Sequence, residues 1–178
     1  MIKGLFGGKK NSTSVEIERK FLLTGLPEAK PERRHHIRQG YIARNGGTVV
    51  RVRQKDDNYI LSVKTPSTGI GRYEIEKTLT ADEAAVLFAA CREPVIEKIR
   101  EIHPHGGHIW EVDIFDGANT GLIVAEVELK SETEDIILPP WIGPEVTGLQ
   151  KFYNAHIAQN PFKSWGVSYA DLVKRLQG

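Results

Sequence analysis

The sequence has a single cysteine, Cys91, among its 178 residues. One cysteine excludes a disulfide within the chain and is typical of a reducing compartment, so we expect a cytoplasmic protein. Long hydrophobic runs are also missing. No stretch could cross a bilayer as a helix, and the first 14 residues contain too few consecutive apolar residues for a signal peptide. We therefore expect no membrane partner.

The chain also lacks an excess of charge of either sign. Its 24 Lys and Arg residues are nearly matched by 23 Asp and Glu residues, for a formal net charge of +1. Such a balance argues against binding of a nucleic acid duplex through the net charge of the whole protein. The hydrophobic content of 40% and charged content of 26% are ordinary for a globular protein, and the length suits one domain.

Short segments rich in strand-forming residues alternate with turn signals along most of the chain. The predicted strands are Val15–Leu23, His35–Arg44, Thr48–Lys55, Asn58–Thr65, Arg72–Leu79, Val95–Ile102, Gly107–Phe115 and Gly121–Ser131. A helix is predicted after the fifth strand, where Thr80 and Glu83 can form a capping box. A second is predicted near the C-terminus, where Ser168 precedes "YADLVKRLQ".

Charged residues occupy one face of nearly every predicted strand. In "VEIERKFLL", Glu16, Glu18 and Lys20 alternate with apolar residues, and side chains two apart in a strand share a face. Seven of the eight strands repeat the pattern, and the second, which contains "QGY", is ambiguous. Acids dominate the first, fifth, seventh and eighth strands, whereas Arg and Lys dominate the third, fourth and sixth.

Two interpretations of the charged face are open. A polar face exposed to water on an antiparallel sheet is the common one. The alternative is an α+β fold in which an eight-stranded antiparallel β-barrel forms a tunnel with a charged bore, its apolar faces pointing outward under covering helices. In that arrangement, clustered carboxylates suit Mg²⁺ or Mn²⁺, and the Arg and Lys side chains suit a di- or triphosphate.

The ordered motifs resemble the CYTH family, the triphosphate tunnel metalloenzymes. Glu16 to Lys20 resembles the family's ExExK signature, and "RQGYI", "TVVRVRQK", "YILSVKT", "IEKIR", "WEVDIFDG" and "GLIVAEVEL" follow in the family's order. The resemblance implies an eight-stranded tunnel over residues 15–162, preceded by a flexible leader over 1–14 and followed by a helical tail over 163–178. Two positions depart from the pattern: Glu101, where many relatives carry Tyr, and Lys151-Phe152, where relatives often show Arg-Tyr.

The resemblance also implies roles for individual residues. The expected metal ligands are Glu16, Glu18, Asp113, Glu126 and Glu128. The expected triphosphate-binding residues are Lys20, Arg51, Arg53, Lys64, Lys98 and Arg100. The expected catalytic residues are Glu18, Lys20 and Lys98, and supporting roles are expected for Arg72, Glu74, Glu76, Glu111 and Lys130.

The implied function is hydrolysis of inorganic triphosphate, or a related triphosphate, by water inside the tunnel with Mg²⁺ or Mn²⁺. A small-molecule triphosphate is the expected partner, and a homodimer is possible. Two alternatives remain open: a cyclase that converts ATP to cyclic AMP, and a polyphosphate- or nucleotide-binding module without turnover. The charged faces are common to all three functions.

Overall fold

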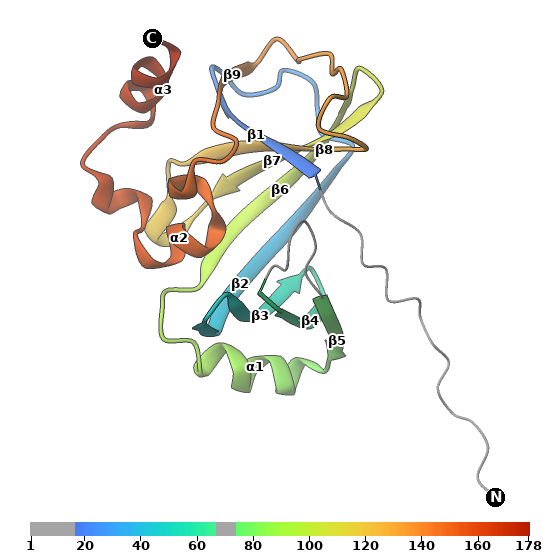
Figure 1. The fold of residues 1–178 in the computed structure, drawn as a ribbon, viewed down its shortest axis with the longest axis vertical. Helices are drawn as coiled ribbons and strands as arrows, with labels where there is room; N and C mark the ends of the chain where they lie inside the picture. The colour runs from blue at the N-terminus through green and yellow to red at the C-terminus, as the bar shows by residue number, and fades with distance from the viewer. Residues whose placement is uncertain (1–16, 67–73) are drawn as a thin grey trace, which may run out of the picture.

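The computed structural model describes residues 17–66 and 74–178. Glu16, Arg72 and the leader over residues 1–14 lie outside this part of the chain. The described residues form one antiparallel nine-stranded sheet with the order β5-β4-β3-β2-β6-β7-β8-β1-β9 and helices packed on it (Figure 1). The predicted α+β class with a mainly antiparallel sheet is therefore confirmed.

All eight predicted strands are present, with ends that differ by at most a few residues. They are β1 (Ile17–Leu23), β2 (Arg33–Asn45), β3 (Thr48–Lys55), β4 (Asn58–Lys64), β5 (Glu74–Leu79), β6 (Ile96–His105), β7 (His108–Phe115) and β8 (Ile123–Leu129). The ninth strand, β9 (Ile142–Glu145), pairs with β1 and was not predicted. In the described part of the chain, β5 and β9 are the sheet edges, so backbone hydrogen bonds do not close the barrel.

The helices follow their capping signals. Helix α1 (Ala81–Ala89) begins after Thr80, which forms the predicted capping box with Glu83. Helix α3 (Tyr169–Gln177) begins after Ser168, whose side chain accepts a hydrogen bond from the backbone N–H of Asp171. Between β8 and α3 lie α2 (Asn154–Gln159) and the 3-10 turns η2 (Gln150–Phe152) and η3 (Phe162–Trp165); a third, η1 (Gly117–Asn119), precedes β8.

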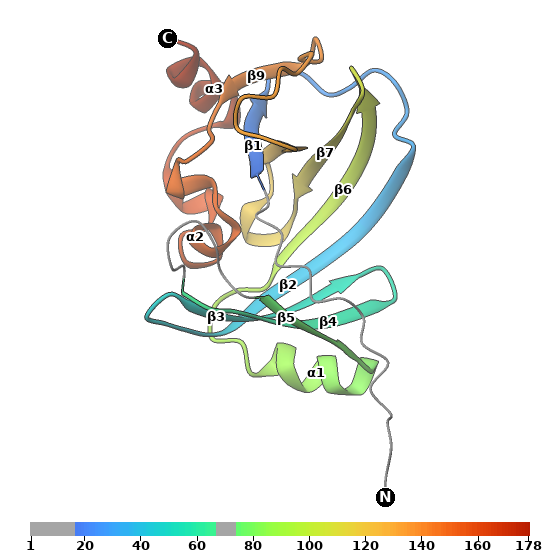
Figure 2. The same ribbon diagram turned by 45° about the vertical axis from the view of Figure 1, so that its right-hand side comes forward.

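The sheet is strongly bent at its two central strands, β2 and β6. Figure 2 shows β3, β4 and β5 as one arm below these strands, and β7 and β1 as part of a second arm above them. A bulge in β2, where Tyr41 pairs with Arg51 but Ala43 pairs with Val50, lies where the first arm begins. The bend gives the sheet an inner and an outer face.

The outer face carries two apolar clusters. One joins Phe21, Trp110 and Val127 of the second arm to Trp141, which follows β8 in the chain. The other places Val52 of β3 against Ala84 of α1. Gly40 of β2 allows Cys91, which follows the end of α1, to pack closely against the strand. A Cβ at position 40 would come within 2.4 Å of the Cys91 Sγ. The apolar sides of the strands therefore face outward beneath covering segments, as the tunnel interpretation predicts.

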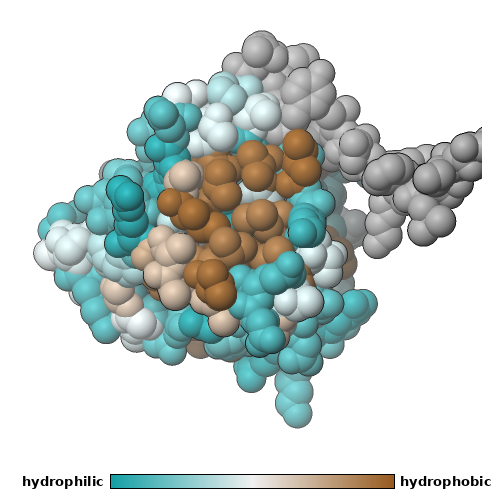
Figure 3. Space-filling view, turned by 90° about the horizontal axis from the view of Figure 1, so that it is seen from below, coloured by the Kyte–Doolittle hydropathy of each residue, from teal (hydrophilic) through white to brown (hydrophobic). Residues whose placement is uncertain are grey.

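Part of the outer surface remains apolar and exposed. Viewed from the side of α1, an apolar patch spreads over the molecule between polar borders (Figure 3). Val86 of α1 and Ile75 of β5 are 69% and 64% exposed. Among the described residues, no helix is both long and apolar enough to cross a membrane.

Candidate active site

The strand register places the predicted site residues on one face of the sheet. Lys20 lies opposite Glu126, Arg100 opposite Asp113, and Lys64 opposite Glu74. Directly paired residues in an antiparallel sheet point to the same side, and residues two apart on each strand follow them. This face, called the charged face below, carries Glu18, Lys20, Arg51, Arg53, Lys64, Glu74, Glu76, Lys98, Arg100, Glu111, Asp113, Glu126 and Glu128.

Glu126 of β8 links two of the predicted phosphate-binding cations. Its Oε1 accepts a hydrogen bond from Lys20 Nζ at 2.5 Å, and its Oε2 accepts one from Arg100 Nη2 at 2.9 Å. Burial and the neighbouring Asp113 act to raise the pKa of Glu126, but Lys98, Lys20 and Arg100 overcome them, and the net shift is downward. The carboxylate is thus held ionised between cations.

Asp113 of β7 is the most deeply buried charge of the site. Its two oxygens accept hydrogen bonds from Arg100 Nε at 2.7 Å and from Lys98 Nζ at 2.5 Å. Burial acts to raise the pKa of Asp113, but Lys98 and Arg100 bring it down to about 2. Burial in turn lowers the pKa of Lys98, against the attraction of Asp113. In the structure, Asp113 therefore fixes the directions of both cationic side chains.

The arm formed by β3, β4 and β5 carries a second set of ion pairs. Lys64 Nζ lies 3.0 Å from Glu74, and Arg53 lies 3.7 Å from Glu76. Arg51 donates from Nε to Ser62 Oγ at 3.2 Å. Burial and the nearby Arg51 lower the pKa of Arg53, and Arg100 of β6 contributes to the same shift. The charge of Arg53 therefore interacts with a cation outside the arm formed by β3, β4 and β5.

Exposure changes steadily along the charged face of the second arm. The Asp113 and Lys98 side chains are 0% and 2% exposed, whereas Glu111 and Glu18 reach 30% and 44%. The site therefore has a buried end at Lys98 and a solvent-accessible end at Glu18.

The carboxylates suit a hard divalent cation in their chemistry. Glu18 of β1 lies directly opposite Glu128 of β8, and Glu111 of β7 lies opposite Glu126. Directly opposed like charges are destabilising unless a cation compensates them. Among the described residues, no preassembled group of three or more potential metal ligands is present, and Glu18, Glu111 and Glu126 form ion pairs with Lys20 or Arg100.

Three polar residues of the site were not predicted. Gln39 and Tyr41 of β2 share the charged face, since they pair with Arg53 and Arg51, and Gln39 Nε2 donates to the Tyr41 hydroxyl at 3.2 Å. Asn154 of α2 accepts a long hydrogen bond of 3.5 Å from Lys98 Nζ. The strand alternation could have found Gln39 had the bulge after Tyr41 been recognised, whereas no local pattern marks Asn154.

Residues that depart from the family pattern lie away from the charged face. Glu101 points to the outer face, where it pairs with Arg34 at 2.6 Å and with His103 at 3.1 Å. Phe152 is buried in a hydrophobic cluster, and Lys151 stacks on Trp165 at 4.1 Å. Lys130, which follows β8, is exposed and forms no ion pair with a described residue.

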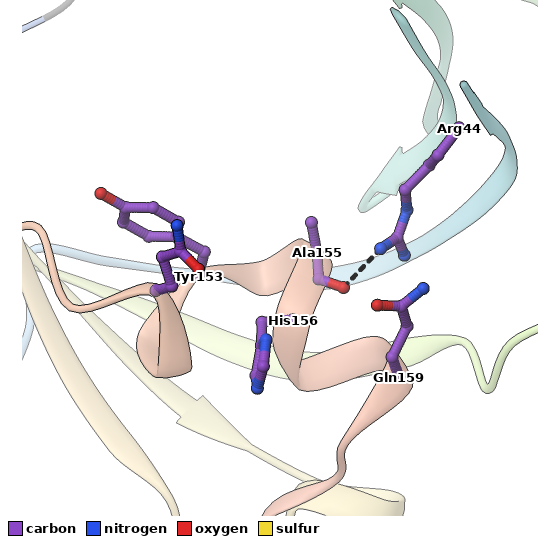
Figure 4. A pocket seen from close by; sticks show the side chains of 6 residues that line it. Arg44, Tyr153, Ala155, His156 and Gln159 are labelled. Carbon is purple, nitrogen blue, oxygen red and sulfur yellow. Dashed lines mark hydrogen bonds between the residues drawn. The ribbon is translucent and has the colours of Figure 1, made fainter. Parts of the chain in front are cut away.

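A shallow surface pocket lies beside α2, at the far end of β2. It is about 230 Å³ in volume and is lined by Arg44, Gln150, Tyr153, Ala155, His156 and Gln159 (Figure 4). Arg44 donates to the Ala155 carbonyl at 2.7 Å and to Glu93 at 2.9 Å, so its guanidinium is already paired. None of the predicted site residues lines this pocket.

The inner face of this antiparallel sheet carries interleaved acids and cations, and comparison with known proteins identifies the family. The CYTH domain matches residues 14–155, and the chain belongs to the CYTH domain family.

Named relatives support this assignment. The chain is 42% identical over 151 residues to an inorganic triphosphatase of Acetivibrio thermocellus, covering 84% of this chain and 97% of that protein. It is 32% identical over 148 residues to an inorganic triphosphatase of Nitrosomonas europaea, covering 81% and 97%. The crystal structure of an inorganic triphosphatase superposes with a TM-score of 0.65 at 30% identity, covering 80% of this chain and 93% of that one.

Proposed function

We propose that this protein is a metal-dependent triphosphatase that hydrolyses inorganic triphosphate by direct attack of water. The observation that carries the proposal is the charged face, on which at least six cations and their carboxylate partners are held by strand register and ion pairs. The two relatives described above, both inorganic triphosphatases, support the same reaction.

The cations of the charged face would bind the phosphate oxygens. Lys20, Lys98 and Arg100 approach from the second arm and from β6, and Arg51, Arg53 and Lys64 from the first arm. Arg forms bidentate contacts with phosphate, and fixed cations stabilise charge as it develops during phosphoryl transfer. Asp113 keeps Lys98 and Arg100 in place for this task, because both its oxygens already accept from them.

We propose Mg²⁺ or Mn²⁺ as the cofactor, held by Glu18, Glu126 and Glu128 with Glu111 nearby; Glu16, also expected to be a ligand, lies outside the described residues. Bound there, the cation would supply positive charge to the phosphate oxygens and make the attacking water more acidic. Asp113 was also expected to be a ligand. Its position between Lys98 and Arg100 favours a positioning role instead.

A substrate panel tests the proposed reaction. Inorganic triphosphate, thiamine triphosphate, ATP and GTP would each be supplied with Mg²⁺ or Mn²⁺, and phosphate, pyrophosphate and cyclic nucleotide would be separated. We expect inorganic triphosphate to have the highest kcat/KM, because the cations of the charged face suit phosphate oxygens, which inorganic triphosphate presents without a nucleoside. A higher kcat/KM for ATP with cyclic AMP as the main product would establish the cyclase instead.

We also propose that the protein acts in the cytoplasm and forms a homodimer. The single cysteine supports a reducing compartment. The exposed apolar patch around Val86 and Ile75 supports a second copy as its partner, since monomers seldom expose large contiguous apolar areas. Helix α1 has exposed acids in its first turn and the exposed Arg92 just beyond its end, an arrangement that would be complementary to itself in an antiparallel pair.

A further inference from the structure

The charged face also carries a histidine, His35 of β2. It pairs directly with Arg100 of β6, and Ile37, two residues further along β2, pairs with Lys98. Directly paired residues in an antiparallel sheet point to the same side, so the imidazole shares the face of both cations. The next residue, His36, is exposed and points to the outer face. The two adjacent histidines therefore lie on opposite sides of the sheet.

The carboxylate of Asp56 fixes the orientation of the His35 ring, with its Oδ2 2.7 Å from His35 Nδ1. Asp56 is itself held by the backbone of β2, because its Oδ1 accepts from the His36 N–H at 2.8 Å and its own N–H donates to the His36 carbonyl at 2.9 Å. It lies in the turn between β3 and β4 with a φ of 51°, a left-handed conformation that aspartate adopts more readily than most residues. A carboxylate at Nδ1 favours the tautomer with its proton there, which leaves Nε2 to face a ligand.

The second ring nitrogen of His35 is available to a ligand. Nε2 forms no hydrogen bond with any residue in the described ranges 17–66 and 74–178. The side chains of His35 and Asp56 are 18% and 43% exposed, so solvent reaches the pair. The charged groups of the neighbouring strands that share this face are Arg33 of β2, Lys55 and Asp56 at the end of β3, and Arg100 of β6. The imidazole therefore lies among cations that attract phosphate.

We infer that His35 is a proton-dependent contact of the anion site: its imidazolium form donates from Nε2 to a phosphate oxygen of the bound ligand, so that binding takes up a proton. Imidazole is the side chain that changes charge between about pH 5 and 8. A phosphate at hydrogen-bonding distance favours the charged form, and by linkage the charged form favours phosphate. Binding should therefore strengthen as the pH falls through this range. The inference rests on the proposed function, because it concerns an anion on the charged face, and it adds regulation by pH.

His35→Gln and His36→Gln form a matched test, because the two residues are adjacent and face opposite sides of the sheet. Calorimetry with Mg²⁺ would measure the Kd of the nonhydrolysable imido analogue of inorganic triphosphate at pH 6 and pH 8. Protonation of the analogue itself affects all three proteins equally, so differences between them report the histidine. We expect the gain in affinity from pH 8 to pH 6 to be about 3-fold or more larger in the unaltered protein than in His35→Gln, the scale of one charge contact at a partly exposed site. His36→Gln should keep the full gain.

NMR of the unaltered protein gives a second readout, which decides even if His35→Gln does not fold. The assigned imidazole resonances would be followed at pH 7 while the analogue is added with Mg²⁺. We expect the imidazolium fraction of His35 to increase as the site fills, because the phosphate stabilises the charged ring. The imidazolium fraction of His36 should stay constant, since this ring lies on the outer face.

Either of two results would overturn the role of His35. His35→Gln could keep the full gain in affinity at low pH, or the ligand could leave the imidazolium fraction of His35 unchanged; both would mean that the pair with Asp56 only stabilises the turn. Failure of the proposed function looks different: inorganic triphosphate would not be hydrolysed, although the analogue bound with uptake of a proton at His35. Hydrolysis without that uptake would overturn the inference alone.

Discussion

Individual residues of the site were predictable where a strand alternates without interruption. Lys20, Arg53 and Glu126 follow from charge at every second position, because alternation fixes the face of a side chain. Their partners were not predictable. That Glu126 lies between Lys20 and Arg100 depends on the pairing of strands far apart in the sequence.

Glu18→Gln should abolish most activity while leaving the fold intact. The substitution removes a charged ligand from the accessible end of the site, and we expect kcat to fall by about 100-fold, the scale seen when one electrostatic partner is removed from a reacting centre. Stability should change by about 1 kcal/mol or less, since Glu18 is 44% exposed and paired with Lys20. Steady-state kinetics and urea unfolding measure both effects, with the exposed Glu132→Gln as the control. An active but easily unfolded Glu18→Gln would instead make this acid structural.

Arg53→Ala should weaken triphosphate binding by about 2 to 3 kcal/mol, in line with removing one partner of a largely desolvated charge contact. Arg53 lies on the charged face with Glu76 at 3.7 Å. Calorimetric titration of triphosphate in the presence of metal would measure the loss, and the exposed Arg92→Ala is the matched control. An unchanged affinity would mean that the charged face of β3 does not contact the ligand.

At the scale of elements, eight of the nine described strands were predicted, whereas the faces of β2 and the existence of β9 were not. β3 was predicted with its observed ends. β2 was ambiguous because the bulge after Tyr41 interrupts its alternation. β9 was missed because "IGPE" is short and contains Gly and Pro, which are unfavourable in strands, and only pairing with β1 makes it a strand.

Hydrogen bonds of one partly buried phenol join helix α3 to the sheet. Tyr169 accepts a hydrogen bond from the Leu23 backbone N–H at 2.8 Å and donates to the Ile123 carbonyl at 2.9 Å. Tyr169→Phe should cost about 1 to 3 kcal/mol, because the Leu23 N–H loses its partner. Chemical unfolding would measure the cost, with the exposed Tyr153→Phe as the control. A cost equal to that of the control would show that α3 is held by apolar contacts alone.

The ionisation of Tyr169 should make the stability of the protein depend on pH. Burial raises the pKa of Tyr169 from 10.0 to about 12. As the pH rises through this range, the unfolded chain releases the phenolic proton first, so this contribution to stability is present below pH 10 and lost between pH 10 and 12. Tyr169→Phe should therefore show a shallower loss of stability over that range than the unaltered protein. Parallel slopes would contradict the assignment.

At the scale of the whole molecule, the sequence predicted the arrangement of the faces better than the closure of the sheet. Apolar residues face outward beneath α1 and the segment containing Trp141, and charges face inward, as expected. The buried cluster that joins Leu22, Ile96, Phe115 and Val124 to the C-terminal segment was not predicted, because it forms only when that segment packs on four separate strands. Such long-range contacts leave no local periodic pattern.

The proposed dimer can be tested through the apolar patch. Val86→Glu places a charge at the centre of the exposed surface of α1 and should convert a dimer to a monomer, since burying an unpaired carboxylate is unfavourable. Sedimentation velocity would measure the change. Leu138→Glu, at an exposed apolar residue elsewhere, should leave the dimer intact. Sedimentation of the unaltered protein as a monomer would contradict the proposal.

The central claim is that the charged face is a metal-dependent triphosphate site, and the release of phosphate from inorganic triphosphate tests it most directly. Rates would be measured with Mg²⁺ or Mn²⁺, after addition of excess EDTA, and again after the metal is restored. Because the carboxylates of Glu18, Glu126 and Glu128 share the face that would bind the polyanion and suit a divalent cation, we expect activity to disappear with EDTA and return with metal. Undiminished hydrolysis in metal-free buffer would contradict the account.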